Sequence, residues 1–124
     1  MKRLPLILGD LFTLAAVTVI GFAMHDEIGL AYLSRFAAAW IPLSLTWFLL
    51  APWFGLFDES VTRNARLLYR PALTVIFAAP LAAVLRGLVL GENIQPIFAV
   101  VLATANAVGM VTWRALWMWM SNRK

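Results

Sequence analysis

Cysteine is absent from the 124 residues of this chain, and histidine occurs once, as His25. The absence of cysteine excludes disulfide bonds, thiolate metal sites and cysteine nucleophiles. One histidine does not supply a histidine-built metal centre within a single chain. The sequence therefore predicts no metal site and no cofactor.

Charged residues are also scarce, at 13% of the chain, whereas hydrophobic residues make up 63%. A soluble domain carries about 25% charged residues because its surface must face water. The mean hydropathy of +0.85 agrees with a surface that faces lipid instead. The formal net charge is +4, but the basic residues lie at the ends of apolar segments. That placement is typical of membrane orientation, and we expect no nucleic-acid partner.

Sequence motifs of catalysis are missing as well. The chain contains no phosphate-binding glycine loop, no G-x-S-x-G nucleophile motif and no metal-ligand spacing. No two carboxylates share a face within an apolar segment, so the sequence offers no pair of residues for general acid–base catalysis. We therefore expect that the protein is not an enzyme.

Long apolar runs dominate what is present. A hydrocarbon core of about 30 Å needs about 20 apolar residues per helix. Four segments meet this length, and we predict spans at about 4–24, 30–53, 71–90 and 95–120. Pro71 and Pro96 stand at the starts of the last two spans, and Gly91 is placed to end the third. The sequence thus predicts one all-α domain over residues 1–124, an integral membrane four-helix bundle.

The basic residues are distributed unevenly between the two ends of these spans. One side carries Arg35 and Arg86. The other side carries Lys2, Arg3, Arg63, Arg66, Arg70, Arg114, Arg123 and Lys124. The positive-inside rule then places both termini in the cytoplasm, for a multi-pass protein of the plasma (inner) membrane.

An acidic residue, Asp10, interrupts the first apolar run about 9 Å from its start. A charge at that depth costs on the order of several kcal/mol unless it is paired, hydrated or protonated. Arg114 reaches a similar depth in the fourth span, and we predict that the two form a buried ion pair. The alternative is an interfacial Arg114 whose guanidinium reaches the lipid phosphates.

A second group of charged residues lies at the opposite, outer side of the spans. It comprises His25, Asp26, Glu27, Arg35, Arg86 and Glu92. We interpret it as a polar cluster whose members neutralise one another and tie helix ends together. The alternative is a small polar vestibule for an ion, a proton or an anionic group.

Three further features concern packing and the membrane surface. Asn106 lies near the middle of the fourth span, so its amide needs a partner, which we expect from a neighbouring helix. Small residues four apart predict close packing of the third and fourth spans: Ala78 with Ala82, Ala79 with Ala83, and Ala105 with Gly109. The tryptophans near the cytoplasmic ends fit an aromatic belt: Trp47, Trp53, Trp113, Trp117 and Trp119.

The longest connection, residues 57–70, carries Arg63, Arg66 and Arg70 at helical spacing. A short interfacial helix that contacts anionic lipid headgroups would use this pattern. A solvated turn would use it equally well.

Several short motifs occur together in a recognisable order. They are GD at residues 9–10, G-x-x-x-H at 21–25, A-W-x-P at 39–42, R-P at 70–71, LRGLVLG at 85–91 and GMVTWRALW at 109–117. With them, nearly the whole chain resembles a family of small four-span bacterial and archaeal membrane proteins catalogued as domain of unknown function number three thousand and fifty-four. The resemblance implies a topology but no activity.

Three functions remain, and we rank them in order. The first is a non-catalytic accessory or scaffolding subunit that docks onto a larger membrane complex or onto copies of itself. The second is a small oligomeric proton-coupled transporter or channel that uses Asp10 or His25. The third is a binder of lipid, quinone or pigment.

Overall fold

A computed structural model describes residues 3–24, 29–93 and 96–123, and within these ranges every regular element is helical. The elements are α1 (Arg3–Met24), η1 (Leu30–Tyr32), α2 (Leu33–Leu50), η2 (Ala51–Phe54), α3 (Glu59–Thr62), η3 (Ala65–Leu67), α4 (Tyr69–Leu90) and α5 (Pro96–Asn122). α1, α2 with η2, η3 with α4, and α5 form four segments that are long and apolar enough to cross a membrane. The predicted all-α four-helix bundle is confirmed.

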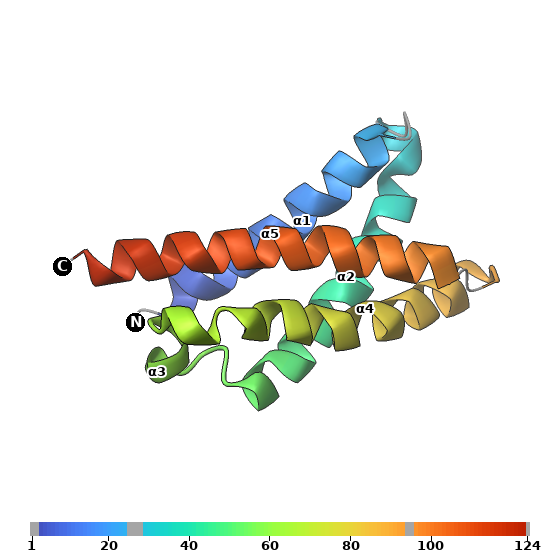
Figure 1. Cartoon of the computed structure of the whole chain (residues 1–124). Helices are drawn as coiled ribbons and strands as arrows, with labels where there is room; N and C mark the ends of the chain where they lie inside the picture. Colours follow the sequence, from blue (N-terminus) through green and yellow to red (C-terminus); the bar gives the residue numbers. More distant parts are fainter. Residues whose placement is uncertain (1–2, 25–28, 94–95, 124) are drawn as a thin grey trace.

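The helices form a bundle in which α1 and α2 lean away from α4 and α5 toward one end (Figure 1). α4 packs extensively on both α2 and α5, whereas α1 packs on α5 and α2. The chain termini and α3 lie together at the opposite end of the bundle (Figure 1). This end, which we call the terminal end, brings α1, α3 and α5 close enough to share a site.

The bends between helices follow from residues with special backbone preferences. Gly91 ends α4 in the left-handed conformation, with φ of 65°, as the sequence predicts. Gly55 ends η2 in the same way, with φ of 71°. Glycine adopts this conformation easily because it has no Cβ, whereas other residues rarely do. The two glycines therefore allow the abrupt turns at which the helices end.

The core is formed by Leu14, Leu43, Trp47, Val75, Ala79 and Met110, among others. The small residues of α4 are all buried: Ala78, Ala79, Ala82 and Ala83. Their short side chains let α4 approach its neighbours closely, as helices in membranes must do to gain packing energy. The predicted close packing of the third and fourth spans is thus found.

The Ala105–Gly109 pair has a different role from the predicted one. Ala105 is exposed, and a Cβ on Gly109 would lie 2.6 Å from Val17 of α1. Gly109 therefore serves the contact of α5 with α1 and not the contact with α4. The sequence motif identified a close approach but did not reveal the partner helix.

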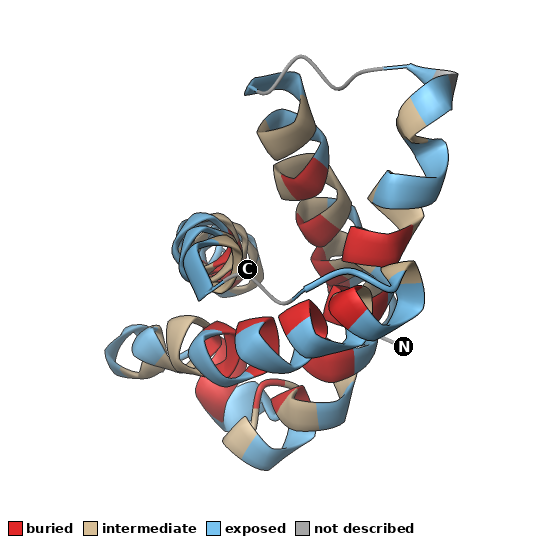
Figure 2. Ribbon diagram, turned by 90° about the vertical axis from the view of Figure 1, so that its right-hand side faces the viewer, coloured by how far each residue is buried: buried red, intermediate tan, exposed pale blue. Residues whose placement is uncertain are grey.

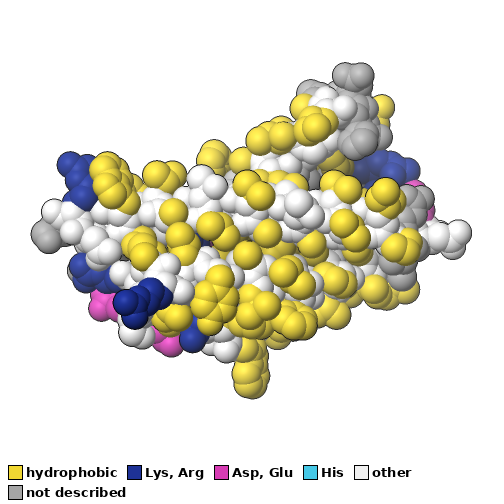
Figure 3. All heavy atoms as spheres, viewed as in Figure 1, with side chains coloured by type: hydrophobic (Ala, Val, Ile, Leu, Met, Phe, Trp, Pro, Cys, Tyr) yellow, Lys and Arg dark blue, Asp and Glu magenta, His cyan; other side chains and the backbone are white. Residues whose placement is uncertain are grey.

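Large apolar side chains cover the outside of the bundle. Phe12 is 73% exposed and Leu88 is 72% exposed. Figure 2 shows buried residues on the inward faces of the helices and exposed residues over much of the outer surface. Apolar side chains spread over the middle of the molecule, and charged ones gather toward its ends (Figure 3). A surface of this kind is suited to lipid rather than water.

The middle connection does not form one interfacial helix. It contains the single turns α3 and η3, separated by Arg63 and Asn64. The Asn64 side chain accepts a hydrogen bond from the backbone N–H of Arg66 and so starts the second turn. An asparagine that bonds to nearby backbone in this way competes with a continuous helix.

Candidate functional site

The carboxylate of Asp10 is the centre of a buried polar cluster that we call the Asp10 clamp. Arg114 donates from Nε to Oδ1 at 3.0 Å and from Nη2 to Oδ2 at 2.8 Å. Two tryptophans also donate, Trp113 Nε1 to Oδ1 at 2.8 Å and Trp47 Nε1 to Oδ2 at 3.2 Å. Each carboxylate oxygen thus accepts two hydrogen bonds. Asp10 has no exposed surface, and Arg114 is 4% exposed.

Arg114 is held by more than its carboxylate partner. Its Nη1 donates to the backbone carbonyl of Leu56, which follows η2. The guanidinium also lies 5.5 Å from the ring centre of Phe57 and 5.8 Å from that of Trp47. Planar guanidinium groups favour both a two-pronged carboxylate contact and an aromatic face. A cavity of only about 10 Å³ borders Arg114, so little space remains beside the group.

Helix periodicity explains why these side chains meet. The buried residues of α1 are Leu6, Asp10, Leu14 and Thr18, and those of α5 are Asn106, Met110, Arg114 and Met118. Both sets recur every four residues and therefore form one narrow stripe along each helix. Asp10 and Arg114 occupy the facing stripes of two antiparallel helices. The clamp joins α1, α2, α5 and the segment after η2.

Gly9 makes the approach of α1 to α5 possible. A Cβ at this position would lie 1.8 Å from the Trp113 ring. Any side chain there would displace the indole that donates to Asp10. The adjacent residues Gly9 and Asp10 thus act together, since one admits the ring and the other binds its N–H.

The buried ion pair predicted between Asp10 and Arg114 is present, and the Arg114 guanidinium is directed at Asp10 inside the bundle. The sequence does not reveal Trp47 and Trp113 as partners of Asp10, because tryptophans near the ends of spans fit a belt equally well. For Trp47 the belt interpretation is wrong, since this residue has no exposed surface. Trp53 and Trp119 are 84% and 59% exposed, as belt residues would be.

The predicted outer polar cluster is divided in the structure. Arg35 pairs with Glu92 at 3.0 Å, with side chains 44% and 42% exposed. Arg86 instead places its guanidinium 4.4 Å from the ring centre of Phe98, and its buried Nε has no hydrogen-bond partner among the described residues. The remaining members, His25, Asp26 and Glu27, lie outside the described residues.

The prediction that Asn106 bonds to a neighbouring helix is wrong. Its Nδ2 donates to the carbonyl of Leu102, one turn earlier in α5, at 2.9 Å. Its buried Oδ1 has no hydrogen-bond partner in the part of the chain that the structure describes. The flexible side chain satisfies its donor locally, because a partner on the same helix is always within reach.

The three arginines of the middle connection differ in their surroundings. Arg63 donates from Nε to Asn122 Oδ1 at 2.9 Å and from Nη2 to the Ser121 carbonyl at 3.1 Å. Arg70 donates to the carbonyl of Phe54 at 3.1 Å. These two residues tie the connection to the rest of the bundle. Arg66 is exposed, as Arg63 is.

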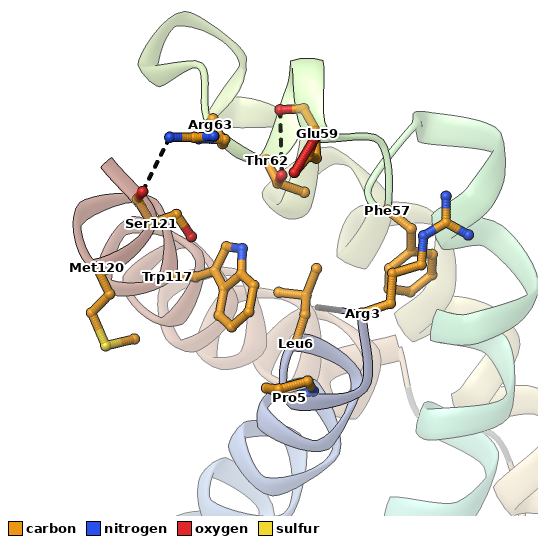
Figure 4. A pocket seen from close by; sticks show the side chains of 10 residues that line it. All are labelled: Arg3, Pro5, Leu6, Phe57, Glu59, Thr62, Arg63, Trp117, Met120 and Ser121. Atoms are coloured by element: carbon orange, nitrogen blue, oxygen red, sulfur yellow. Dashed lines mark hydrogen bonds between the residues drawn. The ribbon is translucent and has the colours of Figure 1, made fainter. Parts of the chain in front are cut away.

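A pocket of about 370 Å³ opens at the terminal end, between the start of α1, α3 and the end of α5 (Figure 4). Leu6, Phe57 and Trp117 contribute apolar and aromatic surface, and Arg3, Glu59 and Arg63 contribute charge. Within the described ranges, no three histidine, cysteine, aspartate or glutamate side chains gather closely enough to hold a metal ion.

The described chain folds into a bundle of four apolar helices, each long enough to span lipid, around a buried ion pair. These are the features of a multi-pass helical membrane protein. The chain belongs to the family described as "protein of unknown function (DUF3054)", whose sequence profile matches residues 7–117. The resemblance inferred from its motifs is thus confirmed. No curated protein and no solved structure matches the chain.

Proposed function

We propose that this protein is a non-catalytic structural subunit that docks its lipid-facing helices onto a larger membrane complex. The observation that carries the proposal is the complete use of Asp10 within the fold. All four of its hydrogen bonds come from three side chains of the chain itself, and none of its surface is exposed. A carboxylate whose four hydrogen bonds are all made within the fold supports a structural role for Asp10.

The competing hypothesis of proton-coupled transport needs a titratable group that exchanges protons with water. Asp10 would have to break its bonds to Arg114, Trp47 and Trp113 before it met water. Removing one partner of a buried pair costs about 3–5 kcal/mol, so such an opening would be rare. The geometry therefore favours a structural role for the one acidic residue inside a span of the described chain.

The surfaces available for docking are the outer faces of α1 and α5. Each of these helices buries only its narrow stripe, so most of its circumference faces outward. Phe12 on α1 and Leu116 on α5 are 73% and 51% exposed. In lipid, helices associate through packing rather than through exclusion of water, and long uncovered helix faces are suited to this.

We further propose that both termini lie in the cytoplasm and that the protein resides in the plasma membrane. Of the described basic residues, Arg3 begins α1, Arg63 and Arg66 lie in the middle connection, and Arg123 follows α5, all at the terminal end. The positive-inside rule relates such a bias to the cytoplasmic side.

Site-specific photo-cross-linking in the native membrane tests the docking proposal. A photoreactive amino acid at Phe12 or Leu116 should give adducts of discrete mass with protein partners, and mass spectrometry would identify them. The matched control is Met110, which has no exposed surface and should give none. The proposal fails if both exposed positions yield lipid adducts alone. It also fails if liposomes with the purified protein show a proton flux above that of protein-free liposomes.

A further inference from the structure

The pocket at the terminal end differs in chemistry from the rest of the surface. Its charged side chains stand around the opening, with Arg63 on one side, Arg3 beside Phe57 on the other, and Glu59 between them (Figure 4). Leu6 lies below, and it is buried at 2% exposure. Two guanidinium groups and one carboxylate give the pocket a net charge of +1. An apolar floor beneath a cationic opening fits an amphiphilic anion.

The location of the pocket relative to a bilayer identifies where that anion would come from. α1 contains 22 residues, which corresponds to about 33 Å and matches a hydrocarbon core of about 30 Å. The first turn of α1 therefore lies at headgroup level, with Arg3 above Leu6. Pro5 and Met120 line the pocket and are exposed, so they form an apolar edge toward the surrounding lipid. A lipid can enter from the side without leaving the membrane.

Hydrogen-bond donors in the pocket remain available for a ligand. Arg63 is held in place by its bonds from Nε and Nη2, but no hydrogen bond between described residues uses its Nη1. The Trp117 indole N–H likewise makes no hydrogen bond within the described chain, and Figure 4 shows it on the pocket side of the ring. A guanidinium that is already oriented binds a phosphate oxygen at a smaller entropic cost.

We propose that this pocket binds one anionic phospholipid through its headgroup phosphodiester. Arg63 and the Trp117 N–H donate to phosphate oxygens, and Arg3, on the other side of the opening, adds a second positive charge that attracts the anion. Glu59 accepts from a headgroup hydroxyl, as in a glycerol headgroup. The acyl chains leave past Pro5 and Met120 along α1 and α5. The single negative charge of a phosphodiester balances the net charge of the pocket.

Native mass spectrometry of the full-length protein in a neutral detergent tests the proposal. Phosphatidylglycerol, phosphatidylethanolamine, phosphatidylcholine and soluble glycerol phosphate are added in separate titrations. We expect one phosphatidylglycerol per chain, bound at least about fivefold more tightly than phosphatidylcholine. Equal binding of all three lipids would overturn the proposal. Displacement of phosphatidylglycerol by an equal concentration of glycerol phosphate would also overturn the proposal, because the ligand would then be a soluble anion.

Charge variants separate a defined site from general attraction to a basic surface. Arg3→Gln should weaken phosphatidylglycerol binding about fivefold, and Glu59→Gln should strengthen it by a similar factor. Arg66→Gln is the matched control, since Arg66 is an exposed arginine of the same connection that does not line the pocket, and it should change nothing. An equal loss in Arg66→Gln and Arg3→Gln would refute the site.

The tryptophan donor gives a second test that does not depend on charge. Trp117→Phe should weaken binding about fivefold because it removes an N–H directed at an anion. Trp119→Phe is the control on the same helix, as Trp119 is exposed and lies outside the pocket. Thermal unfolding of each variant serves as the control that the fold is retained. Unchanged binding in a folded Trp117→Phe variant contradicts the assignment. The proposed docking role does not depend on this site and survives its failure.

Discussion

The Asp10 clamp leads to a quantitative prediction about stability. Asp10→Asn keeps the shape of the side chain but removes its charge, and it turns an amide N–H₂ toward groups that can only donate. Arg114 then remains buried as a charge without its anion. Breaking a buried pair in this way costs about 3–5 kcal/mol. For a chain of this size, that loss corresponds to a fall in Tm of about 10–20 °C.

The assay is thermal unfolding of the purified protein in a mild detergent, followed by tryptophan fluorescence. Arg114→Met, which leaves the carboxylate alone, should cost a similar amount. The double variant Asp10→Asn with Arg114→Met should lose at least about 2 kcal/mol less than the sum of the two single losses, because the two side chains interact directly. Its single asparagine oxygen can still accept from one of the two indoles, which donate to different oxygens of Asp10.

The outcome that refutes this reasoning is specific. If Asp10→Asn unfolds within about 2 °C of the unaltered protein, the pair does not stabilise the bundle. Strict additivity of the two single variants would also refute a direct interaction between the side chains. In either case the proposed structural role of Asp10 loses its main support.

Three further predictions concern the surroundings of the clamp and the outer end of the bundle. Gly9→Val should lower Tm by at least about 10 °C, because its side chain would overlap the Trp113 ring, and Gly21→Val, where the side chain meets nothing, is the control that should change Tm little. Asn106→Leu should leave Tm unchanged or raise it, because it removes a buried oxygen without a partner among the described residues, and a fall of more than about 5 °C would contradict this. Arg35→Gln should cost less than about 1 kcal/mol, since the pair with Glu92 is partly exposed, and a larger loss in the same unfolding assay would show that the pair is better shielded than its exposure indicates.

The bundle itself was predictable because apolar length and helix-ending residues are local signals. Gly91 ends α4 through its own backbone conformation, and Pro96 begins α5 without needing a backbone donor. Asp10 and Arg114 could be paired from depth alone, because a membrane leaves a buried charge few alternatives.

The remainder of the clamp was not predictable because it depends on helix rotation. A tryptophan near the end of a span has the same sequence signal whether it faces lipid or the core. Trp47 faces inward, and Trp53, six residues later, faces outward. For the same reason, the sequence does not show that Gly109 faces α1 rather than α4. It also does not show that the Asn106 amide donates to a carbonyl of its own helix.

The proposal that four helices cross the membrane and carry the terminal end on one side is tested most directly by cysteine accessibility. The chain has no cysteine of its own, so a single introduced cysteine reports one position. Arg66→Cys lies in the connection at the terminal end, and Asn93→Cys lies in the connection between α4 and α5. In intact cells, an impermeant maleimide should label Asn93→Cys and should label Arg66→Cys only after the membrane is opened. Equal labelling of both positions from one side would contradict the account.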